Sequence, residues 1–106
     1  MLVATTNDLP GYRIVAHVDM VRGVTVRSRS IIGDMGGAIQ SIFGGNITIY
    51  TKLAETARKE AYDLMVQHAA EMGANAVVAM RYDANEIMDG VTEVLAYGTA
   101  VRVEPL

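Results

Sequence analysis

The stretch ITIYTKLAETARKEAYDLMVQHAAEM, residues 47–72, decides the fold, because its apolar side chains recur at the spacing of a helix. On a helical wheel these side chains cover an arc of about 120°, which is the width of a stripe that faces a core. The stripe consists of Tyr50, Leu53, Ala54, Ala57, Ala61, Leu64, Met65, His68 and Met72. Asn46 suits an N-cap, and Gly73 suits the left-handed residue that ends a helix. We therefore predict one long amphipathic helix over residues 47–72.

Strand patterns precede this helix. Residues 2–5 predict a short first strand, and NDLPG after them predicts a turn, because Pro and Gly interrupt regular structure. From residue 13 to residue 26 apolar and polar side chains alternate, which is typical of a half-buried strand. Arg22-Gly23 interrupts this alternation and predicts a bulge or turn within the strand.

Two more strand patterns follow the helix, over residues 76–82 and 93–103. The loop between them ends in Asp89-Gly90, a pair that is typical of hairpin turns. The order strand–helix–strand–strand predicts an α+β fold, in which a β-α-β-β chain forms two layers. One antiparallel sheet is backed by the long helix, and a short Gly-rich helix is added between residues 32 and 43.

The last predicted strand has two different faces. One face carries small residues and allows a helix to lie close, where the helix itself has Ala57 and Ala61. This small face consists of Val94, Ala96, Gly98 and Ala100. The other face is bulky and apolar, and consists of Leu95, Tyr97, Thr99, Val101 and Val103. A protein with one long helix has nothing of its own to cover the bulky face, so we expect a neighbouring subunit to cover it.

Composition also indicates an oligomer. With 106 residues the chain forms a single domain, residues 1–106, and 51% of its residues are hydrophobic. If the ten Gly are counted as apolar and the five Tyr are left out, the apolar share exceeds the about 45–50% that is usual for soluble domains. A subunit interface accounts for this surplus, and we predict a homo-oligomer.

Several partners and compartments are disfavoured by composition. The chain has no cysteine, which excludes disulfides and thiolate metal sites and fits a cytoplasmic protein. No signal-peptide pattern opens the sequence, and its longest uncharged run, residues 35–51, is too short and too polar to cross a membrane. The net charge is −3 and the Lys and Arg residues do not cluster, so we expect neither nucleic acid nor a membrane as a partner.

Residues 29–46, RSIIGDMGGAIQSIFGGN, are rich in glycine but match neither a Walker loop nor G-x-G-x-x-G. Within them Ile32, Met35, Ile39, Ile42 and Phe43 are spaced as a short helical stripe. Glycines on the back of such a helix suit close contact with another subunit, although a flexible loop over a ligand site is an alternative. A third possibility is an anion held by the backbone N–H groups of Gly44, Gly45 and Asn46 at the start of the long helix.

Few side chains suggest a reaction centre. His17 and Asp19 alternate onto one strand face and are candidate metal ligands, although two residues do not complete a coordination sphere. His68 lies within the apolar stripe, where we expect a hydrogen-bonded core histidine. Arg58 flanks the stripe and can reach a pocket or an interface, but an i,i+3 pair with Glu55 explains it equally well. Because no nucleophile motif is present, we expect a non-enzymatic protein, with an enzyme acting at a subunit interface through Arg58 as the alternative.

Five motifs in a fixed order resemble the YbjQ-like family of small uncharacterised proteins. They are TTNDLPGY near the start, FGGN before the long helix, ARKEA within it, GANAVV after it and AYGTAV near the end. The resemblance implies a subunit similar to the dodecin type, assembled as a homopentameric ring, and a family label of heavy-metal binding without an established reaction. The matching positions are Pro10, Gly11, Gly44, Gly45, Arg58, Gly73, Asn75, Gly98 and Thr99. Asn46 stands where the family commonly has an acidic residue, which removes an anionic ligand there.

Together these observations predict a cytoplasmic homo-oligomer, a pentamer by resemblance, that holds a small ligand or an ion between its subunits. The candidate ligand-binding residues are Gly44, Gly45, Asn46 and Arg58. The alternative function is heavy-metal binding, with His17 and Asp19 as candidate ligands. Neither a cofactor nor the identity of the ligand follows from the sequence.

Overall fold

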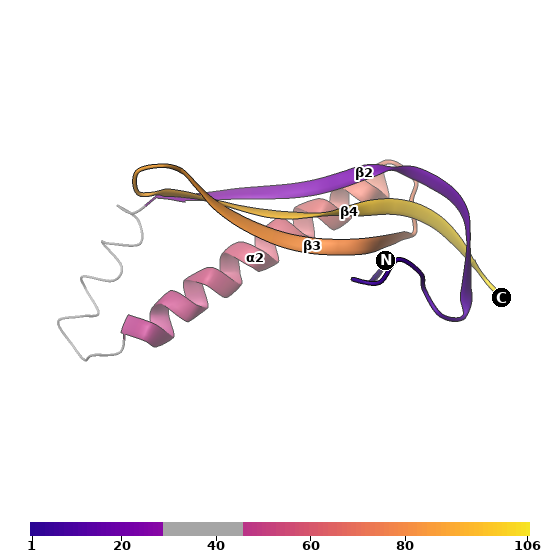
Figure 1. Cartoon of the computed structure of the whole chain (residues 1–106), viewed down its shortest axis with the longest axis horizontal. Helices are drawn as coiled ribbons and strands as arrows, with labels where there is room; N and C mark the ends of the chain where they lie inside the picture. The colour runs from indigo at the N-terminus through magenta and orange to yellow at the C-terminus, as the bar shows by residue number, and fades with distance from the viewer. Residues whose placement is uncertain (29–45) are drawn as a thin grey trace.

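The computed structural model describes the backbone of residues 1–28 and 46–106, and the side chains of residues 1–27 and 51–106. The glycine-rich helix predicted between residues 32 and 43 therefore lies outside the described residues, as do Gly44 and Gly45. Within the described ranges, one helix backs one four-stranded sheet (Figure 1). The predicted α+β fold is confirmed.

After the short first strand, the described elements follow the predicted order of strand, helix and two strands. They are β1 (Leu2–Val3), β2 (Tyr12–Ser28), α2 (Asn46–Glu71), β3 (Ala76–Met88) and β4 (Val91–Pro105). In the sheet the strands lie in the order β1-β3-β4-β2. Strands β2 and β3 both run antiparallel to β4, whereas the short β1 pairs in parallel with β3. The prediction of a purely antiparallel sheet is therefore wrong in one respect: the sheet is mixed, because β1 pairs in parallel with β3 at its edge.

The hairpin of β3 and β4 is longer than the sequence predicted. Its turn does contain Asp89-Gly90, and Gly90 has a positive φ of 75°. However, β3 extends to Met88 and β4 begins at Val91, so Asp83 and Glu86, which fall in the predicted loop, are part of β3. The pairing of the two strands accounts for this, because it continues to Met88 opposite Val91.

The helix ends where the sequence predicted. Gly73 has a φ of 85°, its N–H donates to the carbonyl of Ala70 at 3.0 Å, and the N–H of Ala74 donates to the carbonyl of Ala69 at 3.1 Å. These two bonds form a Schellman motif, which satisfies carbonyls that the helix itself leaves open. Arg102 of β4 also donates to the Gly73 carbonyl, at 2.7 Å, and ties the helix end to the sheet.

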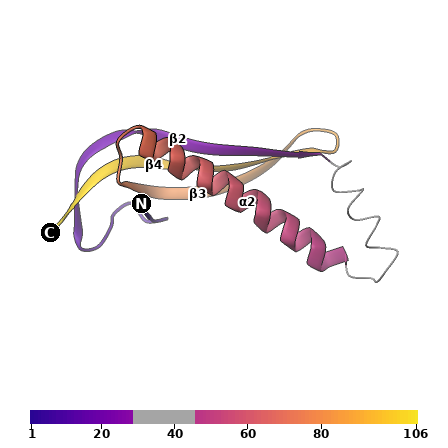
Figure 2. The same ribbon diagram turned by 180° about the vertical axis from the view of Figure 1, so that it is seen from behind.

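The core lies between α2 and the small face of β4, as predicted. Figure 2 shows the helix lying across this side of the sheet. Ala61, Ala96 and Ala100 are fully buried in it, and small side chains at these positions allow the close approach of helix and strand. The buried members of this core are Val21, Ala61, Met65, Ala69, Ala74, Val77, Met80, Ala96 and Ala100.

The prediction of a bulge or turn at Arg22-Gly23 is wrong. The pairing of β2 with β4 is continuous there, with Arg22 opposite Tyr97 and Gly23 opposite Ala96. Gly23 instead marks the place where α2 crosses the strand. A Cβ atom added at Gly23 would overlap the carbonyl oxygen of Ala61 and lie 2.5 Å from the backbone nitrogen of Met65.

The bulky face of β4 is covered at one end by the chain itself, which the sequence did not predict. Val101 and Val103 are buried with Ala76 and Val78, and the cluster is closed by the half-buried Leu9 and Ile14. The segment before β2 folds back over this end of the sheet (Figure 1). Toward the hairpin tip, the bulky face of the sheet has no such cover among the described residues.

Candidate functional site

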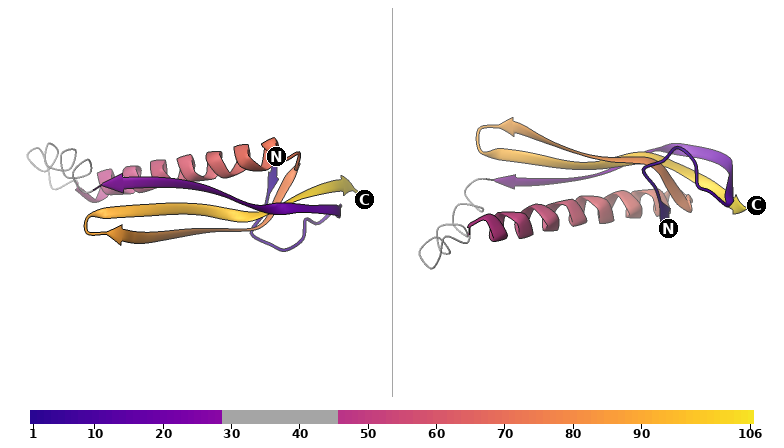
Figure 3. Two further views of the ribbon diagram at one scale, coloured as in Figure 1. Left: turned by 90° about the horizontal axis from the view of Figure 1, so that it is seen from above. Right: turned by 60° about the horizontal axis from the view of Figure 1, so that its bottom comes forward.

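An open groove lies between α2 and the hairpin because the helix is offset on the sheet. α2 packs mainly on β2 and β4 and hardly touches β3. From their contact near the helix end, the helix and the hairpin diverge toward the hairpin tip, as the right-hand view of Figure 3 shows. Toward the hairpin tip, from Arg81 on, the helix-facing side of β3 is therefore left uncovered, whereas Val77 and Met80 before it are buried in the core.

Two adjoining cavities form this groove, and Arg58 lines both. The larger has a volume of about 610 Å³ and is lined by Glu55, Arg58, Lys59, Tyr62, Asp63 and Tyr82. The smaller has a volume of about 210 Å³ and is mostly apolar; it is lined by Arg27, Leu53, Ala54, Ala57, Arg58, Ala84, Thr92 and Val94. We call the two cavities together the Arg58 groove. The larger lies within the range of about 300–1,000 Å³ that is typical of small-molecule sites.

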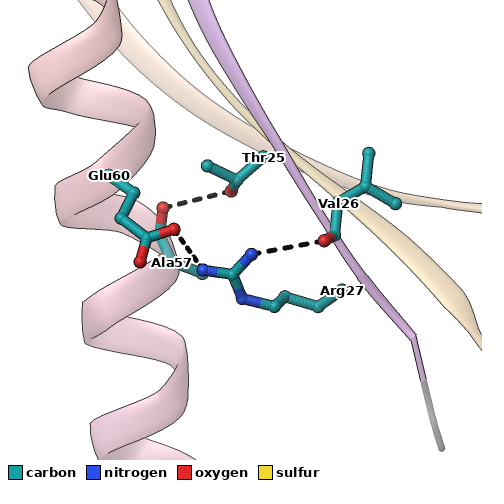
Figure 4. Close-up of polar contacts among 5 residues, drawn as sticks. All are labelled: Thr25, Val26, Arg27, Ala57 and Glu60. Carbon is teal, nitrogen blue, oxygen red and sulfur yellow. Dashed lines mark hydrogen bonds and ion pairs between the residues drawn. The ribbon is translucent and has the colours of Figure 1, made fainter. Parts of the chain in front are cut away.

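The side of the groove next to β2 is closed by polar contacts. Thr25 is buried and donates its hydroxyl hydrogen bond to the carbonyl of Ala57 at 3.2 Å. Arg27 forms an ion pair with Glu60 and donates to the Val26 carbonyl (Figure 4). These contacts join helix and strand on one side, so that ligand access is from the β3 side.

Two surface ion pairs line the outer wall of the groove. Arg58 contacts Glu55 at 3.2 Å and Lys59 contacts Asp63 at 2.9 Å, and all four side chains are more than half exposed. The hydrogen bond to Asp63, together with its charge, raises the pKa of Lys59. Exposed pairs of this kind contribute little to stability, because water screens their charges. A ligand anion can therefore replace Glu55 beside Arg58 at little cost.

Tyr82 forms the wall of the groove opposite the helix. Burial raises the pKa of its phenol, the nearby Tyr62 and Glu55 raise it further, and Arg58 acts in the opposite direction. At neutral pH the hydroxyl therefore remains protonated and can donate a hydrogen bond into the groove. All four of these groups line the larger cavity.

We expect this pKa to make the free energy of unfolding depend on pH in alkaline solution. The folded state holds the Tyr82 proton more tightly than the unfolded state. The protonated phenol therefore contributes its full share to the free energy of unfolding below the usual tyrosine pKa of about 10, and this share is lost as pH rises through the pKa of the folded state. Urea unfolding of Tyr82→Phe between pH 8 and pH 11 should show a shallower loss of stability than wild type. Tyr12→Phe, outside the groove, is the control, and identical slopes for wild type and Tyr82→Phe would contradict the assignment.

His17 and Asp19 do not share a face, in contrast to the alternation of the sequence. A register shift separates them, so that His17 lies opposite Val101 and Asp19 opposite Ala100. Consecutive residues of a strand point to opposite faces, so this register places His17 and Asp19 on opposite sides of the sheet. Asp19 accepts a hydrogen bond from the N–H of Met20 at 2.7 Å. In the described part of the chain, no three His, Cys, Asp or Glu residues are grouped as a metal site.

The other candidate residues fall in different places. His68 is half-buried, and its Nδ1 accepts a hydrogen bond from the Arg22 N–H at 3.4 Å, so it contacts β2 at the rim of the core. Asn46 is the first residue of α2, and its side chain lies outside the described residues. Twelve residues of helix separate Asn46 from Arg58, which is about 18 Å along the axis. Within one chain these two residues therefore do not contact one ligand.

The groove includes two residues that the sequence did not single out, Tyr62 and Tyr82. Tyr62 lies one helical turn after Arg58, a spacing that could have marked it. Tyr82 could not be found in this way, because its place depends on the offset of the helix across the sheet.

In the described ranges the helix is not long and apolar enough to cross a membrane.

Comparisons with known proteins agree with this fold. A family model described as "Putative heavy-metal-binding" matches residues 1–104. A UPF0145 protein of Chromobacterium violaceum is 61% identical over 105 residues, which cover 99% of this chain and 90% of the relative. A UPF0145 protein of Solibacter usitatus is 58% identical, over 97% of this chain and 92% of the relative.

A solved structure is also similar. The crystal structure of a protein of unknown function from Pediococcus pentosaceus, assigned to the DUF74 family, superposes with a TM-score of 0.64 at 17% identity. The match covers 98% of each chain and supports the fold alone. Since the family model spans nearly the whole chain and relatives are about 60% identical over almost their full length, this chain belongs to the YbjQ family.

Proposed function

We propose that the protein is a single-domain, cytoplasmic, non-enzymatic subunit of a homo-oligomeric ring of five copies, which holds a small ligand at Arg58. The observation that carries this proposal is the uncovered part of the sheet. Residues 20, 22, 24 and 26 of β2 alternate with residues that are buried under the helix, and therefore point away from α2.

The uncovered surface is apolar at its centre. Met20, Val24 and Val26 are 65%, 38% and 49% exposed. The pairing places Val24 beside Leu95 and Arg22 beside Tyr97. We call this surface, which consists of Met20, Arg22, Val24, Val26, Asp83, Leu95 and Tyr97, the open sheet face. Contiguous exposed apolar side chains with polar neighbours are typical of protein interfaces.

The shape of the chain also supports association. Its radius of gyration is 17.1 Å, with extents of 56 × 25 × 19 Å. A compact domain of this length has a radius of about 13 Å. An elongated subunit leaves apolar surface uncovered, and a second copy can cover it. The number of five copies rests on the resemblance of the sequence to the YbjQ-like family, which implies a homopentameric ring.

Native mass spectrometry tests the assembly. At micromolar concentration we expect a main species with five times the mass of the 11.4 kDa chain. A protein that stays monomeric under these conditions would contradict the proposal, whereas another closed number would change only the number of copies.

The same spectra test a second candidate function, heavy-metal binding, which the description of the family favours. Protein purified without chelator or histidine tag is measured before and after addition of Zn²⁺, Cu²⁺ or Cd²⁺. A stoichiometric mass increase that His17→Ala abolishes supports a site built from several copies. If no metal is retained at any of these additions, the second candidate is excluded.

A further inference from the structure

We propose that the Arg58 groove binds a small aromatic carboxylate, with the aromatic ring between Tyr62 and Tyr82 and the carboxylate on Arg58. This inference rests on the part of the proposed function that assigns a ligand to Arg58, and it names the chemical class of that ligand. Three features of the groove lead to it: the two aromatic walls, the exchangeable arginine and the balance of charges.

The aromatic walls come from different layers of the molecule. Tyr62 belongs to α2, where it packs partly against the core, and Tyr82 belongs to β3 and is 46% exposed. Both line the same cavity of about 610 Å³. Because the core supports Tyr62, its ring provides a firm surface for a planar ligand. Aromatic pairs in offset or edge-to-face contact contribute about 0.5–1.5 kcal/mol beyond the area they bury.

Arg58 lies where the two cavities meet, and its partner can be exchanged. The side chains of Arg58 and Glu55 are 51% and 68% exposed, so water already weakens their pair. A ligand carboxylate that is shielded by the two tyrosine rings can accept two parallel hydrogen bonds from the guanidinium. Glu55 then turns to solvent, which its exposure allows.

The charges of the larger cavity favour a ligand with one negative charge. Arg58, Lys59, Glu55 and Asp63 all belong to its lining, and once Glu55 has turned to solvent two cations and one carboxylate remain there. One negative charge on the ligand balances this set, whereas a dianion such as a phosphate monoester would carry one charge too many. The smaller cavity, with Ala54, Ala57 and Val94, accepts an apolar extension of the ring.

Isothermal titration calorimetry with 2-naphthoate tests the proposal on the full chain. We expect saturable binding to wild type, and binding at least tenfold weaker to Arg58→Gln, because hydrogen bonds between charged groups contribute about 1.5–3 kcal/mol. Tyr82→Leu should weaken binding by about three- to tenfold. The neutral analogue 2-naphthalenemethanol and the saturated decahydro-2-naphthoate should each bind about tenfold more weakly than 2-naphthoate.

Arg13→Gln is the matched control, because Arg13 forms an equally exposed pair with Glu104 at 3.1 Å but lies outside the groove. It should bind 2-naphthoate like wild type. Absence of saturable binding to wild type would overturn the proposal, as would equal binding by wild type and Arg58→Gln. Circular dichroism confirms that each variant is folded.

Native mass spectra of the same samples separate this inference from the proposed assembly. An oligomer that does not bind 2-naphthoate would refute the ligand class and leave the assembly intact. A monomer that binds 2-naphthoate in an Arg58-dependent manner would refute the proposed assembly and support the proposed ligand class.

Discussion

Replacement of Gly23 by alanine is expected to destabilise the fold more than any other single methyl group added to the described chain. The new Cβ would overlap the carbonyl oxygen of Ala61 and lie 2.5 Å from the Met65 nitrogen and 2.8 Å from the Leu64 Cβ. Two of these three atoms belong to the backbone of α2, so they cannot turn away as a side chain would. The helix itself would have to move off β2, and with it the buried contacts of Met65.

Overpacking of a core typically costs about 1–3 kcal/mol, and a contact with a helix backbone belongs at or above the upper end of that range. We expect Gly23→Ala to lose about 3 kcal/mol of unfolding free energy, which corresponds to a fall in Tm of roughly 12–24 °C for a domain of this size. Chemical and thermal unfolding at one fixed protein concentration measure the loss, because association alters apparent stability.

Gly98→Ala is the matched control for this substitution. A Cβ at Gly98 would lie 2.6 Å from Cγ1 of Val77, a side-chain methyl that can move, and 3.1 Å from the Val78 carbonyl oxygen. We expect a loss of about 1–2 kcal/mol there. If Gly98→Ala lowered the free energy of unfolding as much as Gly23→Ala, the contact of the α2 backbone with Gly23 would not explain the effect of Gly23→Ala.

The second large effect is expected from Val24→Asp, which places a charge in the centre of the open sheet face. Val24 is 38% exposed in the single chain, so the isolated fold should tolerate the change. In the proposed oligomer the same side chain is buried against another copy, where an unpaired carboxylate costs several kcal/mol. We expect the dissociation constant of the assembly to rise by at least about 100-fold, which is 2.7 kcal/mol per contact.

Sedimentation velocity over a range of concentrations measures this change, together with far-ultraviolet circular dichroism to show that the secondary structure remains. Val15→Asp is the control, since Val15 is 46% exposed near a register shift at the other end of β2 and lies outside the open sheet face. It should leave the assembly unchanged. An unaltered oligomer with Val24→Asp would show that the copies associate through a different surface.

Local patterns predicted the elements and the small face of β4 on which the helix packs, because each of these is marked by residues that are close in the sequence. The helix, its Gly73 end, the Asp89-Gly90 turn and the small face of β4 were all predicted, and the structure confirms them. The role of Gly23 was not predicted, because a glycine within a strand pattern is equally consistent with a bulge and with the close passage of another backbone. Only the direction in which the helix crosses the sheet decides between these two.

The candidate site was predicted only in part, for a similar reason. Arg58 was recognised from its place beside the apolar stripe, and the structure places it in a groove. Tyr82 lines the same groove because α2 is offset from β3. No local sequence pattern predicts that offset. The separation of His17 from Asp19 depends on a register shift against β4, a strand more than 70 residues away in the sequence.

The pairing of β2 with β4 has a consequence for how the chain matures during synthesis. Tyr12 lies opposite Pro105, and Ser28 lies opposite Val91. At about 5–20 residues per second, a ribosome completes residue 105 roughly 4–15 s after residue 28. Throughout that interval a 17-residue strand without its neighbour is available to other nascent chains. A copy that still lacks its own β4 can therefore pair its β2 with the β4 of a copy that is further along the same messenger RNA.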